Sequence, residues 1–364
     1  MEILEVMGKL NSGGAESLVI NLYEEIKKGG KHCVSFAEHG HPNNKDLEKK
    51  ILDNGDSIYF FPEFKIYNYF KYKKAVKIFF EKHHFDIVHG HLESAAFIYL
   101  KEAKKQNIKT IIHSHNSKIG RKGIVALIKM AFFVKMRKYA DIFMSCGYDA
   151  ACNRFGKKIA DKKTIYLNNC INIADYSFDN NVRSSIRRLH GINEDSYVIG
   201  IVGRIVKEKN HKFAIKLFNL ICKKNPNTYL MILGAGPLEK SIRKMANKSP
   251  NCDKIIFTGI VDSSKYYNAF DVLIMPSSFE GFPLTLIEAS ANGLTSVVSD
   301  KLPKETRFCS LINVIRYNEI NDWATKISGL MKEKNINRRT IPQEVDNYNV
   351  KNVCENYISI LEKI

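Results

Sequence analysis

The stretch VLIMPSSFEGFPLTLIE (Val272–Glu288) decides the fold class expected for this chain. Its first four residues are apolar without interruption, which is typical of a short strand buried on both faces of a parallel sheet. Residues Thr285–Asn292 follow with helical spacing of their apolar and small side chains. The stretch therefore predicts a strand, a loop and a helix, which is the repeating unit of an α/β fold.

Two carboxylates bracket the start of this predicted helix. Glu280 lies on the loop before it, and Glu288 lies about one turn inside it. Backbone N–H groups at a helix start lack intrahelical partners and bind anions, so both side chains are expected to face one ligand there. Two glutamates around a helix start also occur as a solvated face with a capping charge, and their spacing alone leaves both interpretations open.

Short apolar runs alternate with amphipathic stretches along the whole chain. Strands are predicted at Ile3–Met7, Cys33–Ala37, Ile87–His89, Thr110–His113, Ile142–Ser145 and Thr164–Leu167, and then at Val198–Val202, Tyr229–Leu233, Ile255–Phe257, Val272–Met275 and Ser296–Val298. Helices are predicted at Ala15–Lys28, Tyr69–Lys82, Glu93–Gln106, Phe213–Lys223, Leu238–Lys248, Ser263–Phe270 and Asn349–Ile364. A polar, turn-rich stretch, 172–192, is expected to separate the two sets of strands.

A series of short motifs follows the predicted strand ends in a fixed order. They are Gly13-Gly14-Ala15-Glu16, His89-Gly90-His91, His113-Ser114-His115-Asn116, Asn169-Cys170-Ile171-Asn172, Gly203-Arg204, Lys209-Asn210, Gly234-Ala235-Gly236-Pro237, Phe257-Thr258-Gly259 and Glu280-Gly281-Phe282-Pro283-Leu284 with Glu288-Ala289. Each motif alone is a weak signal. In this order the chain resembles the retaining nucleotide-sugar glycosyltransferases of family 4, also called group 1, and in particular their capsule and exopolysaccharide branch.

This resemblance implies the GT-B fold, with two facing Rossmann-like domains built on parallel sheets. We expect an acceptor-binding domain at residues 1–175 and a nucleotide-sugar-binding domain at 176–345. The last helix, within 346–364, is expected to cross back and pack on the N-terminal domain.

Arg204 and Lys209 are the candidate cations for a diphosphate. Arg204 directly follows the predicted strand Val198–Val202, at the strand end where α/β proteins bind ligands, and Lys209 follows on the same loop. Arginine binds phosphate oxygens as a fork and lysine as a point charge, so the pair could clamp a diphosphate. The alternative from spacing alone is an exposed basic loop.

The resemblance assigns the other site residues. Glu280 is expected to contact sugar hydroxyls and to stabilise the developing positive charge, and Glu288 is expected to hold the ribose. His115 would contact the donor sugar, and Gly14 would bring backbone donors to the reaction centre. Further contacts to the nucleotide sugar are expected from Gly281, Phe282 and Val261.

The two His-x-His pairs raise the alternative of a metal site. Residues i and i+2 of a strand share a face, but no carboxylate triad accompanies the histidines, and no Asp-x-Asp is present. We therefore expect no metal and no other cofactor. The nucleoside diphosphate sugar, expected to be UDP-linked, is a substrate.

The resemblance implies a retaining, metal-independent transfer of a hexose-type sugar to a glycan acceptor, expected to be linked to polyprenyl diphosphate. The alternatives are a sugar-nucleotide epimerase of the same fold, or a basic scaffold or nucleic-acid-binding protein. The eight cysteines include no C-x-x-C, which indicates a reduced, cytoplasmic chain. No secretory signal or membrane-spanning segment is expected.

The chain carries a net charge of +18, and the excess is uneven. Between Lys101 and Lys138 only Glu102 opposes a dense set of lysines and arginines, and Phe64–Lys77 interleaves lysines with aromatic residues. Such segments fit peripheral contact with an anionic membrane at its cytoplasmic face, or they form a solvated lysine-rich surface. No nucleic-acid-binding module is present, so no nucleic-acid partner is expected.

Overall fold

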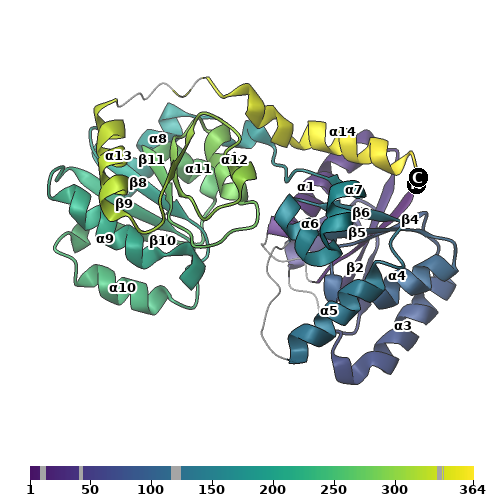
Figure 1. Cartoon of the computed structure of the whole chain (residues 1–364). Coiled ribbons are helices and arrows are strands. Elements are labelled where there is room, and N and C mark those ends of the chain that lie inside the picture. Colours follow the sequence, from purple (N-terminus) through teal and green to yellow (C-terminus); the bar gives the residue numbers. More distant parts are fainter. Residues whose placement is uncertain (9–13, 41–43, 116–123, 334–337, 339) are drawn as a thin grey trace. The chain divides into compact units, whose positions relative to one another are not determined.

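The computed structural model describes residues 1–8, 14–40, 44–115, 124–333, 338 and 340–364. The chain forms two compact units (Figure 1). Unit 1 contains Met1–Cys170 and Val350–Ile364, and unit 2 contains Ile171–Asn349. Within the described residues, no helix is both long and apolar enough to cross a membrane.

Unit 1 is built on a parallel sheet of seven strands in the order β3-β2-β1-β4-β5-β6-β7. The strands are β1 (Glu2–Val6), β2 (Cys33–His39), β3 (Ile58–Phe61), β4 (Ile87–Gly90), β5 (Lys109–Ser114), β6 (Ile142–Ser145) and β7 (Thr164–Tyr166). Its helices are α1 (Gly14–Gly29), α2 (Lys45–Asp53), α3 (Tyr69–Lys82), α4 (Ala96–Lys105), α5 (Ile124–Met136), α6 (Tyr148–Phe155), α7 (Lys157–Lys162) and α14 (Val350–Leu361).

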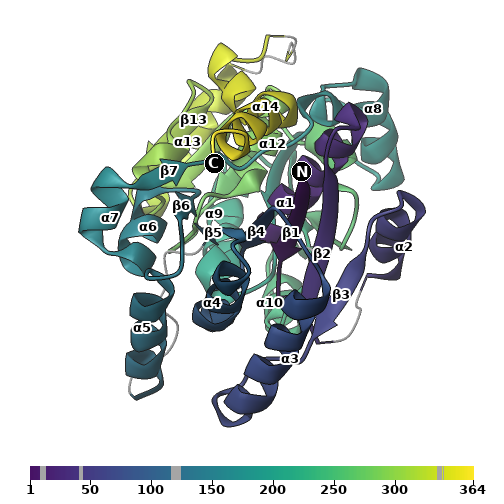
Figure 2. The ribbon, with the colours of Figure 1, turned by 90° about the vertical axis from the view of Figure 1, so that its right-hand side faces the viewer.

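Helices cover both faces of this sheet because successive side chains of a strand point to opposite sides. Leu4 and Val6 pack with the residues of α3, α4 and α5, whereas Ile3 packs with those of α1 and α14. Figures 1 and 2 show α3 and α5 at the same end of unit 1. The C-terminal helix α14 thus belongs to the unit that the chain's first residues form.

Unit 2 repeats this architecture with a parallel sheet of six strands in the order β10-β9-β8-β11-β12-β13. The strands are β8 (Tyr197–Val202), β9 (Thr228–Leu233), β10 (Ile255–Gly259), β11 (Val272–Met275), β12 (Ser296–Ser299) and β13 (Ile312–Ile315). Its helices are α8 (Asn180–Leu189), α9 (His211–Cys222), α10 (Glu239–Asn247), α11 (Ser263–Tyr266), α12 (Leu284–Ala291) and α13 (Ile320–Lys332).

The expected fold class is confirmed, and every predicted strand is present with ends that agree to within about two residues. Strands β3 and β13, which lie at the edges of the two sheets, were not predicted. An edge strand has one neighbour instead of two, and all four residues of β13 are only half-buried. Its run Ile-Asn-Val-Ile therefore lacks the uninterrupted apolar character of a central strand.

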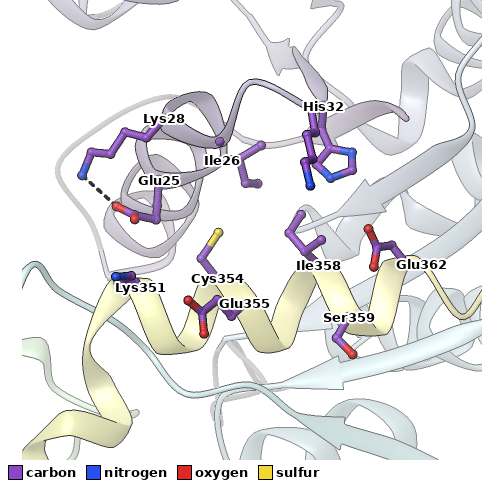
Figure 3. A pocket seen from close by; sticks show the side chains of 12 residues that line it. Glu25, Ile26, Lys28, His32, Lys351, Cys354, Glu355, Ile358, Ser359 and Glu362 are labelled. Atoms are coloured by element: carbon purple, nitrogen blue, oxygen red, sulfur yellow. Dashed lines mark hydrogen bonds and ion pairs between the residues drawn. The ribbon is translucent and has the colours of Figure 1, made fainter.

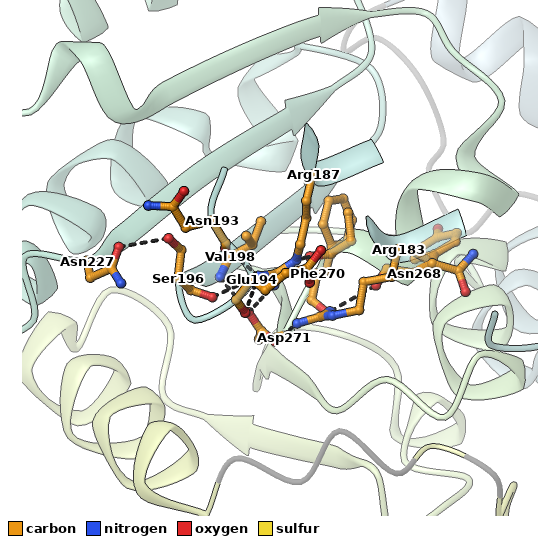
Figure 4. Close-up of polar contacts among 12 residues, drawn as sticks. Arg183, Arg187, Asn193, Glu194, Ser196, Val198, Asn227, Asn268, Phe270 and Asp271 are labelled. Carbon is orange, nitrogen blue, oxygen red and sulfur yellow. Dashed lines mark hydrogen bonds and ion pairs between the residues drawn. The ribbon is translucent and has the colours of Figure 1, made fainter. Parts of the chain in front are cut away.

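The polar stretch 172–192 was expected to be a simple break between the two sets of strands. It instead contains α8 (Asn180–Leu189). Two of its arginines, Arg183 and Arg187, are buried (Figure 4). Each lies 2.7 Å from a different carboxylate oxygen of Asp271, which also accepts a hydrogen bond from the Val198 N–H. This network fastens α8 to the amino ends of β8 and β11.

Candidate active site

Two loops at the carboxyl edge of the unit 2 sheet bring distant residues together. Strand β8 lies between β9 and β11, so the strand order reverses between β8 and β11. Such a reversal is where open α/β sheets bind ligands. The loop after β8 carries Lys209 and the loop after β11 carries Glu280. The Ser278 N–H donates to the Glu208 carbonyl at 2.8 Å, which joins the two loops.

Lys209 and Glu280 form an ion pair in this structure. The Lys209 Nζ lies 2.8 Å from Glu280 Oε1, although the angles are not those of a hydrogen bond. The two side chains are 16% and 13% exposed, so the pair is largely shielded from water. These residues were expected to have separate roles, and the structure brings them into contact.

Arg204 differs from Lys209 in having no partner for its charge. It follows β8, is exposed, and its side chain has no ion pair or hydrogen bond with any residue in the described ranges. Nearby, α12 begins after Pro283, which has no side-chain group to cap the helix. The first N–H groups of α12 therefore lack a side-chain cap and can bind an anion.

Glu288 lies on α12 and is held by two tyrosines that the sequence analysis missed. The Tyr267 hydroxyl donates to Glu288 Oε2 at 2.6 Å, and Tyr176 also bonds this carboxylate. Burial raises the pKa of Glu288, and the two hydrogen bonds and the charge of Lys209 act in the opposite direction. Neither tyrosine belongs to one of the motifs: Tyr176 lies in the stretch expected to be a break, and Tyr267 lies in the predicted helix Ser263–Phe270.

Phe282 and Val261 were predicted to contact the nucleotide sugar, but their side chains pack against other residues of unit 2. The ring of Phe282 stacks on Tyr348, with ring centres 5.3 Å apart, and lies 6.0 Å from Phe308. Val261 packs against an apolar cluster that includes residues of β8, β9, β11, α11 and α12. Their side chains thus stabilise the loops, and their backbones, with that of Gly281, remain the candidates for ligand contact.

Unit 1 has the same reversal of strand order, between β1 and β4. Gly14 begins α1 after β1, and His115 follows β5. Gly13 and Asn116, which completed two of the motifs, lie outside the described residues. The register pairs Glu5 of β1 directly with His89 of β4, so a carboxylate and an imidazole lie side by side in the sheet.

Glu5 joins the histidines into one buried cluster. His91 Nε2 lies 2.7 Å from Glu5 Oε2, and His91 Nδ1 lies 2.7 Å from His115 Nε2. On the other side, the Tyr357 hydroxyl of α14 lies 2.7 Å from His89 Nδ1 and 3.1 Å from Glu5 Oε1. Glu5 and Tyr357 were not predicted as site residues, although an acidic residue inside an otherwise apolar predicted strand was a usable signal.

The cluster has a definite charge distribution. Burial raises the pKa of Glu5, but its interactions with His89 and His91 outweigh burial and hold the pKa well below its usual range. Burial lowers the pKa of His91 to about 4 and also lowers the pKa values of His113 and His115. At neutral pH the carboxylate is ionised, and these three imidazoles are neutral.

His89, His91 and His113 each place a ring nitrogen within 4.8 Å of the others, which makes them a candidate metal site. Their orientation fits an ion poorly. The lone pair of an imidazole lies in the ring plane, and the rings of His89 and His113 stack with 15° between their planes. Both nitrogens of His91 are also engaged. The metal-free expectation remains a prediction.

A cavity of about 520 Å³ lies between α1 and α14, away from these residues (Figure 3). It is lined by the last turns of α1, by His32 and by α14. Because α1 starts at the carboxyl edge of the sheet, its last turns lie towards the amino ends of the strands. The cavity is therefore distinct from the strand reversal of unit 1.

Two family models match the chain, one in each unit. The Glycosyltransferase Family 4 model matches residues 12–148, and the model for glycosyl transferases group 1 matches residues 182–344. The chain therefore contains a family 4 glycosyltransferase domain in unit 1 and a group 1 glycosyltransferase domain in unit 2.

Proteins with similar sequences are also named as glycosyltransferases. The putative glycosyltransferase EpsF of Bacillus subtilis is 28% identical over 334 residues, 90% of this chain and 86% of the relative. The capsular polysaccharide biosynthesis glycosyltransferase CapM of Staphylococcus aureus is 28% identical over 48% of this chain and 46% of its own. An Escherichia coli α-1,3-galactosyltransferase that acts with UDP-Gal on GlcNAc-diphosphoundecaprenol is 22% identical over 60% and 59%.

Solved structures show the same fold. The HepE protein of Anabaena, crystallised in complex with UDP, superposes with a TM-score of 0.82 over 100% of both chains at 12% identity. The glycosyltransferase therefore has the GT-B fold, as the sequence analysis expected.

Proposed function

We propose that this glycosyltransferase transfers a hexose-type sugar, with retention and without a metal ion, from a UDP-sugar to a lipid-diphosphate-linked glycan during cell-surface polysaccharide synthesis. The single observation that carries the proposal is the contact between Lys209 and Glu280 at the strand reversal of unit 2. A cation for the leaving diphosphate and a carboxylate for the sugar are the two groups that this reaction requires.

In unit 2, each side chain near the reversal has a distinct part in donor binding. Lys209, the unpaired Arg204 and the start of α12 would bind the diphosphate. Glu288, held by Tyr267, would accept hydrogen bonds from the ribose hydroxyls. Glu280 would contact the transferred sugar, and its negative charge would stabilise the positive charge that develops on the anomeric carbon.

The reaction breaks the bond between the anomeric carbon and a diphosphate oxygen. The acceptor hydroxyl oxygen then bonds to that carbon from the same face, and its proton passes to the departing diphosphate. Unit 1 would bind the acceptor, with Gly14 and His115 near the reacting groups. The names of the relatives support a UDP-linked donor and a lipid-diphosphate acceptor.

The proposal predicts transfer by the purified chain from a UDP-sugar to an acceptor carried on polyprenyl diphosphate. A panel of UDP-, GDP- and ADP-sugars identifies the donor, and NMR of the product gives the anomeric configuration, which we expect to match that of the donor. Activity should survive excess chelator. Consumption of the donor without an acceptor would indicate an epimerase, and activity restored only by a divalent ion would contradict the metal-free mechanism.

Unit 1 would also contact the membrane that carries such an acceptor. Tyr67 and Phe70, before and on α3, are 83% and 82% exposed, and Leu127, Met130 and Val134 form an exposed apolar stripe on α5. Both helices lie at one end of unit 1 (Figure 2). Lysines lie close to these residues in the sequence, and each cation contributes about 1 kcal/mol at an anionic leaflet. Basic and aromatic side chains together fit peripheral binding at the cytoplasmic face.

Replacing both Tyr67 and Phe70 with alanine should weaken binding to anionic vesicles, because their rings would no longer enter the headgroup region. Co-sedimentation with anionic and neutral vesicles, at low and high salt, measures this. Ile260→Ala is the matched control, since Ile260 is 85% exposed but lies in unit 2. Equal binding to both lipids, or an equal effect of the control, would identify the lysines as a solvated surface.

A further inference from the structure

We propose that Glu5 and His91 are positioning residues that hold His115 as a neutral imidazole protonated on Nε2, so that its Nδ1 is a hydrogen-bond acceptor. The ligand of this nitrogen is a hydroxyl group of the sugar or the glycan. This inference rests on the proposed function only for the identity of that ligand. The protonation state itself follows from the hydrogen bonds of the cluster.

The charge of Glu5 determines which atom donates and which accepts in each hydrogen bond from Glu5 to His115. An ionised carboxylate can only accept hydrogen bonds, so His91 must donate to Glu5 Oε2 from its Nε2–H across 2.7 Å. A neutral imidazole carries one N–H, and the His91 Nδ1 is therefore an acceptor. His115 Nε2 lies 2.7 Å from this acceptor and must supply the proton. The remaining nitrogen of His115, Nδ1, then carries a lone pair.

The Nδ1 of His115 is the last acceptor of this hydrogen-bond chain. It is buried and has no hydrogen-bond partner among the residues that the structure describes. A buried polar atom without a partner carries a free-energy cost, because it has given up its hydrogen bonds to water. A ligand hydroxyl that donates to it would recover that cost. Because the lone pair repels other acceptors, this position favours a hydroxyl over a phosphate oxygen and over a carboxylate.

His91 and Tyr357 contact different oxygens of Glu5, which provides a matched control, whereas His89 Nδ1 lies 3.3 Å from Oε1 and 3.2 Å from Oε2. Oε2 accepts from His91, whereas Oε1 accepts from the Tyr357 hydroxyl at 3.1 Å. Tyr357→Phe removes the second interaction and leaves the chain from Glu5 through His91 to His115 intact. Glu5→Gln disturbs that chain, because an amide can present either its oxygen or its NH₂ group to His91. Glu5→Met removes the acceptor altogether.

The test is ¹⁵N NMR of the full chain with labelled histidine, with His115 assigned by a His115→Gln variant. The protonated and unprotonated nitrogens of a neutral imidazole differ strongly in ¹⁵N shift. Wild type and Tyr357→Phe should show one neutral form of His115, with the proton on Nε2. Glu5→Gln and Glu5→Met should show a mixture of both neutral forms.

Two results would overturn the inference. One is a wild-type His115 that is protonated on Nδ1 or is charged at neutral pH. The other is a wild-type spectrum of His115 in both Glu5 variants, with folding verified by circular dichroism; if neither variant folds, the wild-type spectrum decides. Where transfer is measurable, Glu5→Gln should lower kcat by at least about 10-fold, since an orienting carboxylate of this kind sets the reactive form of its histidine. Absence of any transfer would contradict the proposed function but not the protonation of His115.

Discussion

Asp271→Asn should lower the free energy of unfolding of unit 2 by about 3–5 kcal/mol, the cost of breaking a buried ion pair on one side. Asp271 forms ion pairs with two arginines whose side chains are at most 2% exposed, and its own side chain is 6% exposed (Figure 4). Asparagine keeps the shape of the side chain but removes the charge. Arg183 and Arg187 would then be buried cations without a counter-ion.

Asp271→Asn should also disturb the positions of the site residues, in addition to lowering the stability of unit 2. Asp271 directly precedes β11, and the loop after β11 carries Glu280. Arg183 and Arg187 also donate to backbone carbonyls, among them those of Asn268 and Ala269. Those bonds cannot replace the carboxylate, because a carbonyl carries only a partial charge.

Trp323 makes this measurement specific to unit 2. It is the only tryptophan in the sequence and is fully buried in that unit, so its fluorescence during urea denaturation reports the unfolding of unit 2. Asp262→Asn is the matched control, because the pair of Asp262 with Lys265 is exposed and 3.7 Å long. The control should change stability by less than about 0.5 kcal/mol. An equally small effect of Asp271→Asn would mean that the carbonyl groups suffice.

Glu280→Gln should lower kcat by about 10²–10³-fold, the range for removing one group that stabilises transition-state charge. Because Glu280 pairs with Lys209 in the structure, the same change releases Lys209. The affinity for UDP should therefore be unchanged or higher in this variant. Lys209→Ala should do the reverse and weaken UDP binding by about 1.5–3 kcal/mol, the range for hydrogen bonds to charged groups.

Calorimetric titration with UDP and steady-state kinetics separate these two effects. Glu239→Gln is the control for the carboxylate change, since Glu239 pairs with Arg243 on the surface of α10, and it should alter neither quantity. If Glu280→Gln lowers both the affinity for UDP and kcat, then the assignment of catalysis to Glu280 and of UDP binding to Lys209 is wrong. An unchanged UDP affinity in Lys209→Ala would remove Lys209 from the diphosphate site.

The fold was largely predictable because central parallel strands are buried on both faces and must be apolar throughout. Val272–Met275 and Ile142–Ser145 were predicted with the bounds that the structure has. The positions of Lys209, Glu280 and His115 after strand ends were likewise predictable, because each follows a short apolar run in the sequence. The edge strand β13 was missed because partial exposure relaxes that apolar requirement.

Local sequence alone determined which residues lie at the carboxyl ends of the strands, because the alternation of strands and helices is encoded within short segments. Tertiary structure decided which of them meet. The Lys209–Glu280 pair, the tyrosines on Glu288, and the path from Glu5 to His115 all join residues from different strands or helices. Their contacts depend on strand order and register, which arise only when the sheets assemble. The arginines of α8 show the same limit. Arginine is mostly a surface residue, so burial of Arg183 could not be predicted without knowing that Asp271 lies beside it.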